Sequence, residues 1–269
     1  MKAQIKQAMT IISLAWQKNF TYRFTVLTYR VGEIAEVLVL ILMWSAIYAT
    51  SATVIKGFSL NEMITYVLIG NLVSVAVRNF LTTSVSKDIS EGRLSMFLVK
   101  PIPYLKYVFI NELGRSFLST VISVATQIVV ILFFLDKVYI NLDPSYLAVI
   151  VAMVILAFVI EFQISFIIGT ISFWTDEVNG LQLTIERVKR FFSGGYFPLS
   201  LLPGALASTA ILLPFGYSFF FPASLYLKKM SLADGVKGLV VQVIWIVLFS
   251  IIIHIVWRMG LKRYEAVGS

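Results

Sequence analysis

Hydrophobic residues gather along this chain in long blocks, which are separated by short polar segments. The blocks span approximately residues 34–51, 63–77, 111–135, 145–174 and 236–257. Apolar blocks of this kind are typical of helices that cross a membrane. With one further crossing between residues 176 and 236, the pattern predicts an all-α polytopic membrane protein. It has six transmembrane helices in a single domain, residues 1–269.

The polar segment at residues 82–103 separates the second block from the third. It carries charges of alternating sign, and its apolar positions recur at helical spacing: Val85, Ile89, Met96 and Phe97. This pattern predicts one or two short amphipathic helices that break at Gly92. Pro101 and Pro103 then end the helical segment, because proline lacks a backbone donor and disfavours helical backbone in the residue before it.

Part of this segment resembles a known family. The run Glu91-Gly92-Arg93-Leu94, followed by Phe97-Leu98-Val99-Lys100-Pro101, resembles the G-x-L…L-x-x-P passage of ABC-2 type permeases, in the branch long filed as a domain of unknown function. In those permeases the passage holds the coupling helix, which sits in a cleft of a separate cytoplasmic ATPase. The resemblance implies an ATPase-coupling set in this chain: Lys87, Asp88, Glu91, Gly92, Arg93, Leu94, Phe97, Lys100 and Pro101. The alternative is a solvated loop with a loose amphipathic helix.

Residues 1–24 predict an amphipathic helix that lies on the cytoplasmic leaflet ahead of the first span. Apolar residues recur there every three or four positions, with lysines nearby: Ile5, Met9, Ile12, Trp16 and Phe20. The segment lacks the apolar core and cleavage site of a secretory signal. Tyr29 and Arg30, just before the first span, also resemble the amino-terminal pattern of the family, although an ordinary interfacial anchor has the same composition.

Two carboxylates fall inside predicted spans. Glu36 stands one turn into the first span, and Glu161 lies near the middle of the fourth. A charge at the centre of a membrane costs about 2.5–3.5 kcal/mol on insertion scales, so we expect both to face protein or a polar cavity. Glu161 is therefore a candidate for a substrate route. The alternative is a structural hydrogen bond between helices, with Gln163 nearby in sequence.

The fifth span has two possible positions. Either it begins near Asn179 and carries four charged residues within the membrane, or those residues are cytoplasmic and the span begins at Phe191. In the first case the charges line a hydrated route and neutralise one another in part, with Glu186 and Arg190 on one helical face. The candidate route residues are then Glu186, Arg187, Lys189 and Arg190. Their basic character would favour a substrate with negative charge.

Residues 194–227 are apolar but are interrupted by glycine and proline, which is unfavourable for backbone in contact with lipid. They predict a re-entrant outer helical hairpin, packed on protein, between the fifth and sixth spans. The runs Ser193-Gly194-Gly195-Tyr196-Phe197-Pro198-Leu199, Leu202-Pro203 and Leu213-Pro214-Phe215-Gly216 resemble the corresponding passage of ABC-2 permeases. The residues expected to shape this hairpin are Gly194, Gly195, Pro198, Pro203 and Pro214.

Composition narrows the class of protein. Hydrophobic residues make up 59% of the 269 residues and the mean hydropathy is +0.89, which excludes an ordinary soluble domain. The net charge of +8 comes from lysines and arginines beside the apolar blocks, which predicts cytoplasmic termini and no nucleic acid partner. The chain has no cysteine and no P-loop, zinc-protease or serine-hydrolase motif. We therefore expect no metal or cofactor on this chain, which would not be an enzyme by itself.

The resemblance implies the permease subunit of an ATP-driven ABC-2 type exporter in a prokaryotic plasma membrane. ATP and magnesium would bind a separate cytoplasmic ATPase subunit, present in two copies. Six spans enclose too little for a large route, so we expect a second permease, related but different, besides membrane lipids. Two alternatives stay open: an ion-coupled secondary transporter that uses the intramembrane carboxylates, and a non-transport membrane assembly protein.

Overall fold

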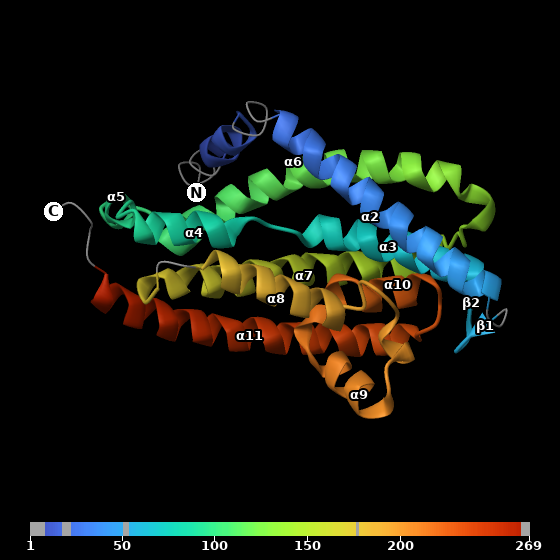
Figure 1. Cartoon of the computed structure of the whole chain (residues 1–269). Helices are drawn as coiled ribbons and strands as arrows, with labels where there is room; N and C mark the ends of the chain where they lie inside the picture. Colours follow the sequence, from blue (N-terminus) through green and yellow to red (C-terminus); the bar gives the residue numbers. More distant parts are fainter. Residues whose placement is uncertain (1–8, 18–22, 51–53, 176–177, 265–269) are drawn as a thin grey trace.

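The computed structural model describes residues 9–17, 23–50, 54–175 and 178–264, most of which are helical. Figure 1 shows an elongated bundle in which the long helices lie side by side. The helices are α2 (Arg23–Thr50), α3 (Leu60–Val77), α4 (Leu81–Ser90), α5 (Leu94–Leu98), α6 (Tyr104–Phe133), α7 (Pro144–Thr170), α8 (Asn179–Phe192), α9 (Gly204–Leu212), α10 (Phe220–Tyr226) and α11 (Leu232–Arg263). A two-stranded hairpin, β1 (Val54–Ile55) and β2 (Phe58–Ser59), lies between α2 and α3. The prediction of an essentially all-α protein is confirmed.

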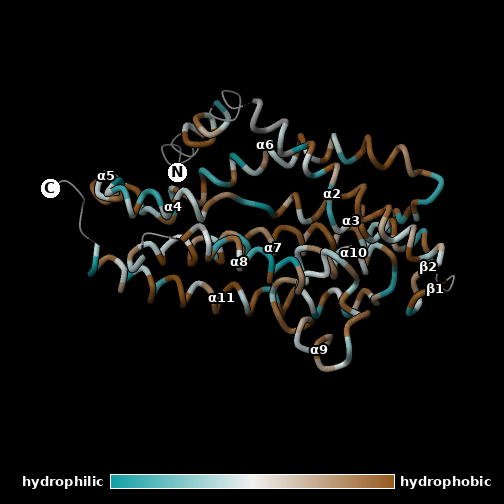
Figure 2. The backbone as a smooth tube through the Cα atoms, in the orientation of Figure 1, coloured by the Kyte–Doolittle hydropathy of each residue, from teal (hydrophilic) through white to brown (hydrophobic). Residues whose placement is uncertain are grey.

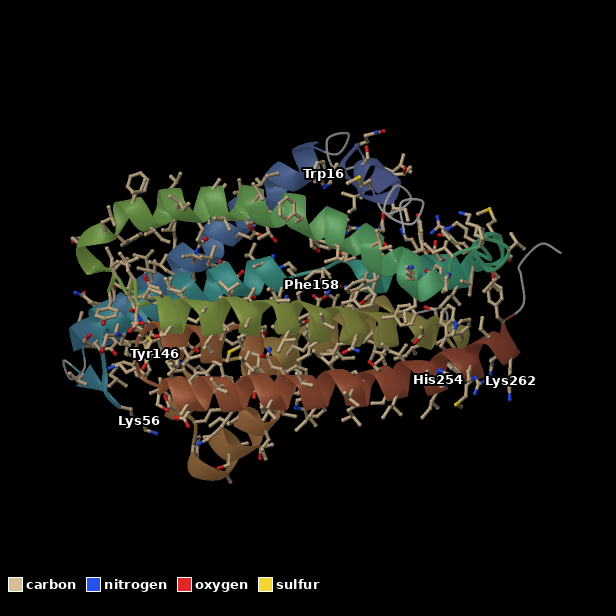
Figure 3. The ribbon with its side chains drawn as sticks, turned by 180° about the vertical axis from the view of Figure 1, so that it is seen from behind. Trp16, Lys56, Tyr146, Phe158, His254 and Lys262 are labelled. Atoms are coloured by element: carbon tan, nitrogen blue, oxygen red, sulfur yellow. The ribbon has the colours of Figure 1, made fainter. Side chains whose placement is uncertain are left out.

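The bundle has two distinct ends (Figure 1). One end carries α5 and the last described residues of the chain, and we term it the α5 end. The opposite end carries β1 and β2, and we term it the β-hairpin end. Figure 3 marks the two ends by Lys262, near the end of α11, and Lys56, in the turn between the strands.

Five segments of the described chain are long and apolar enough to cross a membrane: Arg30–Thr50, Leu60–Ser90, Tyr104–Phe133, Pro144–Phe173 and Leu232–Arg263. Figure 2 shows hydrophobic residues along most of α11, as expected of a helix that faces lipid. Where the sequence predicts a fifth span, the structure has α8, which is 14 residues long. A helix of that length extends for about 21 Å, less than the roughly 30 Å of a bilayer core.

The second membrane-spanning segment, Leu60–Ser90, is longer than the span at residues 63–77 that the sequence predicts. The apolar pattern ends the span at Val77 and returns the chain to the cytoplasm at Arg78. In the structure, residues 78–80 are not helical, but α4 then continues towards the α5 end (Figure 1). The difference arises because α4 buries an apolar stripe that contains Leu81 and Val85. The predicted break at Gly92 is confirmed, since α4 ends before it and α5 begins after it.

The helix at residues 9–17 lies against α6. The indole nitrogen of Trp16 donates a hydrogen bond to the backbone oxygen of Gly114 at 2.8 Å. The ring of Trp16 also stacks with Phe117, with the ring centroids 6.4 Å apart. The predicted amphipathic helix at residues 1–24 is therefore helical over its described central part, and its remaining residues lie mostly outside the described ranges.

The buried apolar side chains form two main cores, one towards each end of the bundle. The β-hairpin-end core gathers around Met63, Tyr66 and Phe219 and connects α2, α3, α7 and α10. The α5-end core contains the apolar stripe of α4 and the aromatic residues of α6, α7 and α11. Within it, Tyr104 and Trp257 stack with their ring centroids 5.3 Å apart. The interior is therefore divided along the bundle axis.

Two glutamines join α7 to α11 in a reciprocal arrangement. Gln163 of α7 donates to the backbone oxygen of Ile246 at 3.1 Å and to the hydroxyl of Ser250 at 2.8 Å. Gln242 of α11 donates to the backbone oxygen of Met153 at 3.0 Å. Hydrogen bonds of this kind act as specific fasteners between helices in lipid, where no hydrophobic force draws helices together. The pair α7–α11 is accordingly a continuous unit along the bundle.

The α4 helix packs closely on α7. The hydroxyl of Thr82 donates to the backbone oxygen of Ser165 at 3.1 Å, and the hydroxyl of Ser86 lies 2.6 Å from that of Ser172 in η2 (Ile171–Phe173), directly after α7. Gly169 lies directly beneath α4, where it permits the two backbones to approach.

Replacing Gly169 by alanine is expected to destabilise the protein by about 1–3 kcal/mol, because it overpacks a filled interface. A Cβ atom there would lie 2.8 Å from the Cβ of Val85 and 3.0 Å from the backbone oxygen of Thr82. Thermal unfolding in detergent, followed by tryptophan fluorescence, measures the change. Gly32→Ala is the matched control, since nothing lies within 4 Å of its Cβ position. An unchanged melting temperature for G169A would contradict the close packing of α4 on α7.

Candidate functional site

A series of charged side chains crosses the interior of the bundle and connects α6, the link between α3 and α4, α2, α8 and α7. We term it the charged belt. Its members are Arg30, Glu33, Glu36, Arg78, Glu112, Glu161, Lys189 and Arg190. Charged side chains are costly within membrane-spanning segments and are expected to pair with one another. Four of these residues are basic and four are acidic, so their formal charges balance.

Glu33 is the centre of the first half of the belt. Its carboxylate pairs with the guanidinium of Arg30 at 2.7 Å and with that of Arg78 at 3.2 Å. The hydroxyl of Ser123 donates to it at 3.4 Å, and Arg30 also donates to the hydroxyl of Ser119 at 3.0 Å. Arg30 and Glu33 are both buried. This cluster connects α2 to α6 and to the α3–α4 link.

The second half of the belt holds α8 between two other helices. Lys189 pairs with Glu161 of α7, and Arg190 pairs with Glu36 of α2. The Arg190 guanidinium also lies 5.3 Å from the ring centroid of Tyr196, in a cation–π contact. Glu161 is buried, and both basic side chains are half-buried. Two adjacent residues of α8 thus bind carboxylates on two different helices, α7 and α2.

The structure bears on where the helix of the predicted fifth span begins. The described helix runs from Asn179 to Phe192 and no described helix begins at Phe191, so the start near Asn179 agrees with the structure. The predicted contact between Glu186 and Arg190 is also absent from the described ion pairs. Glu186 instead accepts from Gln182 at 2.8 Å. Helical spacing placed the two charges on one face, but Arg190 reaches a carboxylate on another helix.

The predicted basic character of this region is largely neutralised. Lys189 and Arg190 are two of the three cations on which the expectation of a negatively charged substrate rests, and each has a carboxylate partner. Glu186 and Arg187 lie on the exposed face of α8. The exposed face of α8 therefore carries one negative and one positive side chain at these two positions.

The turn at the α5 end is built from the predicted coupling residues. Gly92 has a φ of +74°, a left-handed backbone that glycine adopts without steric cost. Arg93 pairs with Asp88 at 3.2 Å and with Glu91 at 3.3 Å across this turn. Asp88 also accepts from the hydroxyl of Tyr104 at 2.8 Å, which ties the turn to the first residue of α6. The turn is therefore fixed on both sides.

The remaining coupling residues divide between a buried base and an exposed surface. Leu94 is fully buried, and Phe97 packs on Tyr104 and Tyr107 with ring centroids 5.4 and 4.9 Å away. The Lys100 ammonium lies 4.2 Å from the Phe97 ring centroid. Beside them is a shallow depression of about 290 Å³. The exposed residues, which we term the coupling surface, are Lys87, Glu91, Met96, Leu98, Val99, Lys100 and Pro101.

The predicted hairpin-shaping residues lie between α8 and α10. Gly194 has a φ of +82°, and its backbone oxygen accepts from the buried hydroxyl of Tyr66 at 2.7 Å. A Cβ atom at Gly194 would lie 2.6 Å from that hydroxyl oxygen, so the site requires glycine. The others lie at boundaries: Gly195 in the turn after α8, Pro198 before η3 (Leu199–Leu201), Pro203 before α9 and Pro214 at the start of η4 (Pro214–Ser218).

The lysines at the β-hairpin end are neutralised by nearby carboxylates. Lys228 pairs with Asp143 at 3.1 Å, and Lys229 pairs with Glu62 at 2.5 Å. The Ser145 hydroxyl, followed by the Lys228 ammonium, holds the pKa of Asp143 below its ordinary value. Asp143 in turn raises the pKa of Lys228. Both groups therefore stay charged around neutral pH.

Comparison with known protein families decides the identity of the chain. A family model described as ABC-2 family transporter protein matches residues 34–268. The chain belongs to the ABC-2 transporter family. The matched range includes the α5 end, all of α8 to α11 and most of the charged belt. No curated protein matches the chain.

In the ABC-2 protein the structure adds four charged residues to the predicted candidate site. Arg30, Glu33, Arg78 and Glu112 are flanking charges by hydropathy alone, yet the structure joins them within the bundle. One local signal was available, since Arg30 and Glu33 are three residues apart and share a helical face. The other contacts join residues far apart in the sequence.

Substituting Glu161 by alanine in the ABC-2 protein should cost about 3–5 kcal/mol of stability, because it leaves a half-buried Lys189 without its partner. The double variant Glu161→Leu/Lys189→Leu removes both charges and should recover most of that loss. Thermal unfolding in detergent compares the two variants. Asp136→Asn, at an exposed loop carboxylate, is the control and should leave the melting temperature unchanged. Equal destabilisation by the single and double variants would show that the ion pair does not hold α8.

Proposed function

We propose that this ABC-2 protein is the membrane-spanning permease subunit of an ATP-driven exporter, and that a separate cytoplasmic ATPase supplies the energy. The family match over residues 34–268 supports a transporter component. The observation that carries the coupling proposal is the exposed apolar surface on the rigid turn at the α5 end. ATP and magnesium would bind the partner, because this chain carries no P-loop sequence.

The coupling surface fits a protein partner. Val99 is 85% exposed, Met96 57% and Leu98 49%, and they lie at an end of the bundle rather than along its lipid-facing sides. Apolar residues gathered on such a surface mark a docking site. The buried Leu94 lies beneath them, and the exposed Arg93 pairs with Asp88, which Tyr104 of α6 also binds; these contacts connect the surface to α4 and α6. A force applied by an ATPase here would therefore reach the spans directly.

Val99→Asp tests this docking site. A carboxylate at the centre of the interface should weaken capture of the ATPase by about tenfold or more, as expected when a central apolar contact is lost. Copurification of the ATPase from native membranes, together with ATP hydrolysis by the complex, measures the effect. Leu142→Asp is the matched control, because Leu142 is 76% exposed near the opposite end.

Two outcomes would redirect the proposal. Equal recovery of the ATPase with both variants would place its contact elsewhere on the chain. Purification of the unmodified protein without any ATPase would favour the ion-coupled transporter or the assembly protein instead.

We place the substrate route along the exposed face of α8. Glu186 and Arg187 lie on this face, while the next turn binds Glu161 and Glu36 on the neighbouring helices. A charged face within the membrane requires water or protein beside it. A second permease, related to this chain but different from it, would enclose a hydrated route when placed against α8. The paired permeases and two ATPase subunits would form the exporter.

The sixth crossing would be completed by α8 together with residues 193–226. The helix α8 begins towards the α5 end, α9 projects from the side of the bundle, and α10 leads to the β-hairpin end (Figure 1). Prolines and glycines interrupt this stretch, and its backbone packs on protein in part, as Gly194 does on Tyr66. This arrangement fits the predicted re-entrant hairpin.

We place the α5 end of the ABC-2 protein on the cytoplasmic side of a prokaryotic plasma membrane, and the charge distribution supports this orientation. Basic residues at that end outnumber acidic ones, whereas the two lysines after α10 have carboxylate partners. The basic residues are Lys87, Arg93, Lys100, Lys106, Arg258, Lys262 and Arg263. Both termini would then be cytoplasmic.

Single cysteines test the orientation, since the natural chain has none. A membrane-impermeant maleimide should label Lys56→Cys in intact cells and Lys262→Cys only after the cells are opened. The two positions mark opposite ends of the bundle (Figure 3). Labelling of Lys262→Cys in intact cells would reverse the proposed topology.

A further inference from the structure

The break between α3 and α4 is held by side chains of another helix. None of residues 78–80 is proline or glycine, the common causes of a broken helix. The backbone N–H of Phe80 donates to the Glu112 carboxylate on α6 at 3.2 Å. The backbone oxygen of Arg78 accepts from the hydroxyl of Ser116, also on α6, at 3.4 Å. Backbone N–H and C=O groups within a membrane need hydrogen-bond partners. Side chains of α6 supply these partners at the break.

Two more contacts complete the link. The Asn79 side chain accepts from the backbone N–H of Leu81 at 3.2 Å and so satisfies a donor in the first turn of α4. The Arg78 side chain pairs with Glu33 of α2. Glu112 itself is 1% exposed, and it shares the single proton of the Ser116 hydroxyl, 3.3 Å away, with the backbone oxygen of Arg78. The link is therefore held by side chains, in place of a helical hydrogen-bond ladder.

The helices on either side of the link belong to different packing units. α4 is fastened to α7 through Thr82, Ser86 and the close approach at Gly169. α3 instead belongs to the β-hairpin-end core, where Tyr66 contacts the turn after α8. The division between the two hydrophobic cores falls at the link.

We propose that residues 78–80 form a hinge and that Glu112 is its positioning residue. Through this hinge, α4 and α5 move with α7 as one body, and α7 shifts against α3 where the two helices meet in the β-hairpin-end core. Only the source of the movement rests on the proposed function, in which an ATPase presses on the coupling surface. The hinge itself is a property of this chain. Rearranging three residues held by side chains disturbs fewer hydrogen bonds than bending a continuous helix.

A first measurement uses this chain alone in lipid nanodiscs, in its natural cysteine-free background. Spin labels at Asn61→Cys and Ser90→Cys report the distance across the hinge, and labels at Ser90→Cys and Ile155→Cys report the distance between α4 and α7. Glu112→Leu removes the acceptor for Phe80 and should broaden the 61–90 distance distribution, leaving the 90–155 distribution unchanged. Glu112→Gln keeps an oxygen acceptor and should leave both unchanged. Unaltered distributions in the leucine variant, or equal broadening of both, would overturn the hinge.

A second measurement uses the unmodified Glu112 and the complex with its ATPase, trapped with ATP and vanadate. The 61–90 distance should shift from its nucleotide-free value, whereas the 90–155 distance should not. If transport proceeds and both distances shift alike, or neither shifts, the hinge is wrong. This measurement also decides the question if the leucine variant does not fold. If the unmodified chain captures no ATPase, the proposed function fails, and the first measurement still tests the hinge.

Discussion

Every charge and backbone polar group that lies within the membrane-spanning part of this protein must be satisfied without bulk water, and this constraint shapes the interior. Glu33 binds two guanidinium groups, and Glu112 accepts the backbone N–H of Phe80 at the break between α3 and α4. Lys189 and Arg190 each reach a carboxylate on a different helix. The charged belt consists of the side chains that meet these requirements. Within it, Glu33 is bound by two cations, whereas Glu112 is bound by a backbone N–H and a hydroxyl group.

Such pairs position helices more than they stabilise them. Removing two charges from water costs about as much as their attraction returns, so a buried pair contributes little net stability, whereas breaking it is costly. For α8 the distinction matters, because this amphipathic helix is too short to cross a membrane and is fixed by Glu161 on one side and Glu36 on the other. Its depth and rotation follow from those contacts. Those contacts leave Glu186 and Arg187 on the exposed face of the helix.

Local patterns in the sequence predicted most helices and the turn at Gly92. They could not predict contacts between residues that lie far apart in the sequence. Long apolar blocks indicate spans, and Gly92 indicates a break because the turn there needs a left-handed residue. The cost of a buried carboxylate also singled out Glu161. Its partner could not be chosen, because Lys189 lies 28 residues away on another helix, and spacing rules apply only within one helix. Arg78 was assigned to the membrane boundary for a related reason: a cation after an apolar block is typical of a cytoplasmic flank.

The same contacts determine how the bundle can change shape. α7 and α11 are joined along their length by Gln163 and Gln242, so they are expected to respond as one body. The turn at the α5 end is bound to α6 through Asp88 and to the end of α11 through Tyr264, whose hydroxyl accepts from the backbone N–H of Ser95 at 3.1 Å. A displacement of that turn therefore enters α4, α7 and α11 together. It reaches α3 along the chain through the three residues of the link, where side-chain hydrogen bonds replace the helical ladder. It also reaches α3 in space, through the contacts of α3 with α6 and α7. The charged belt includes this link, and the same belt anchors α8.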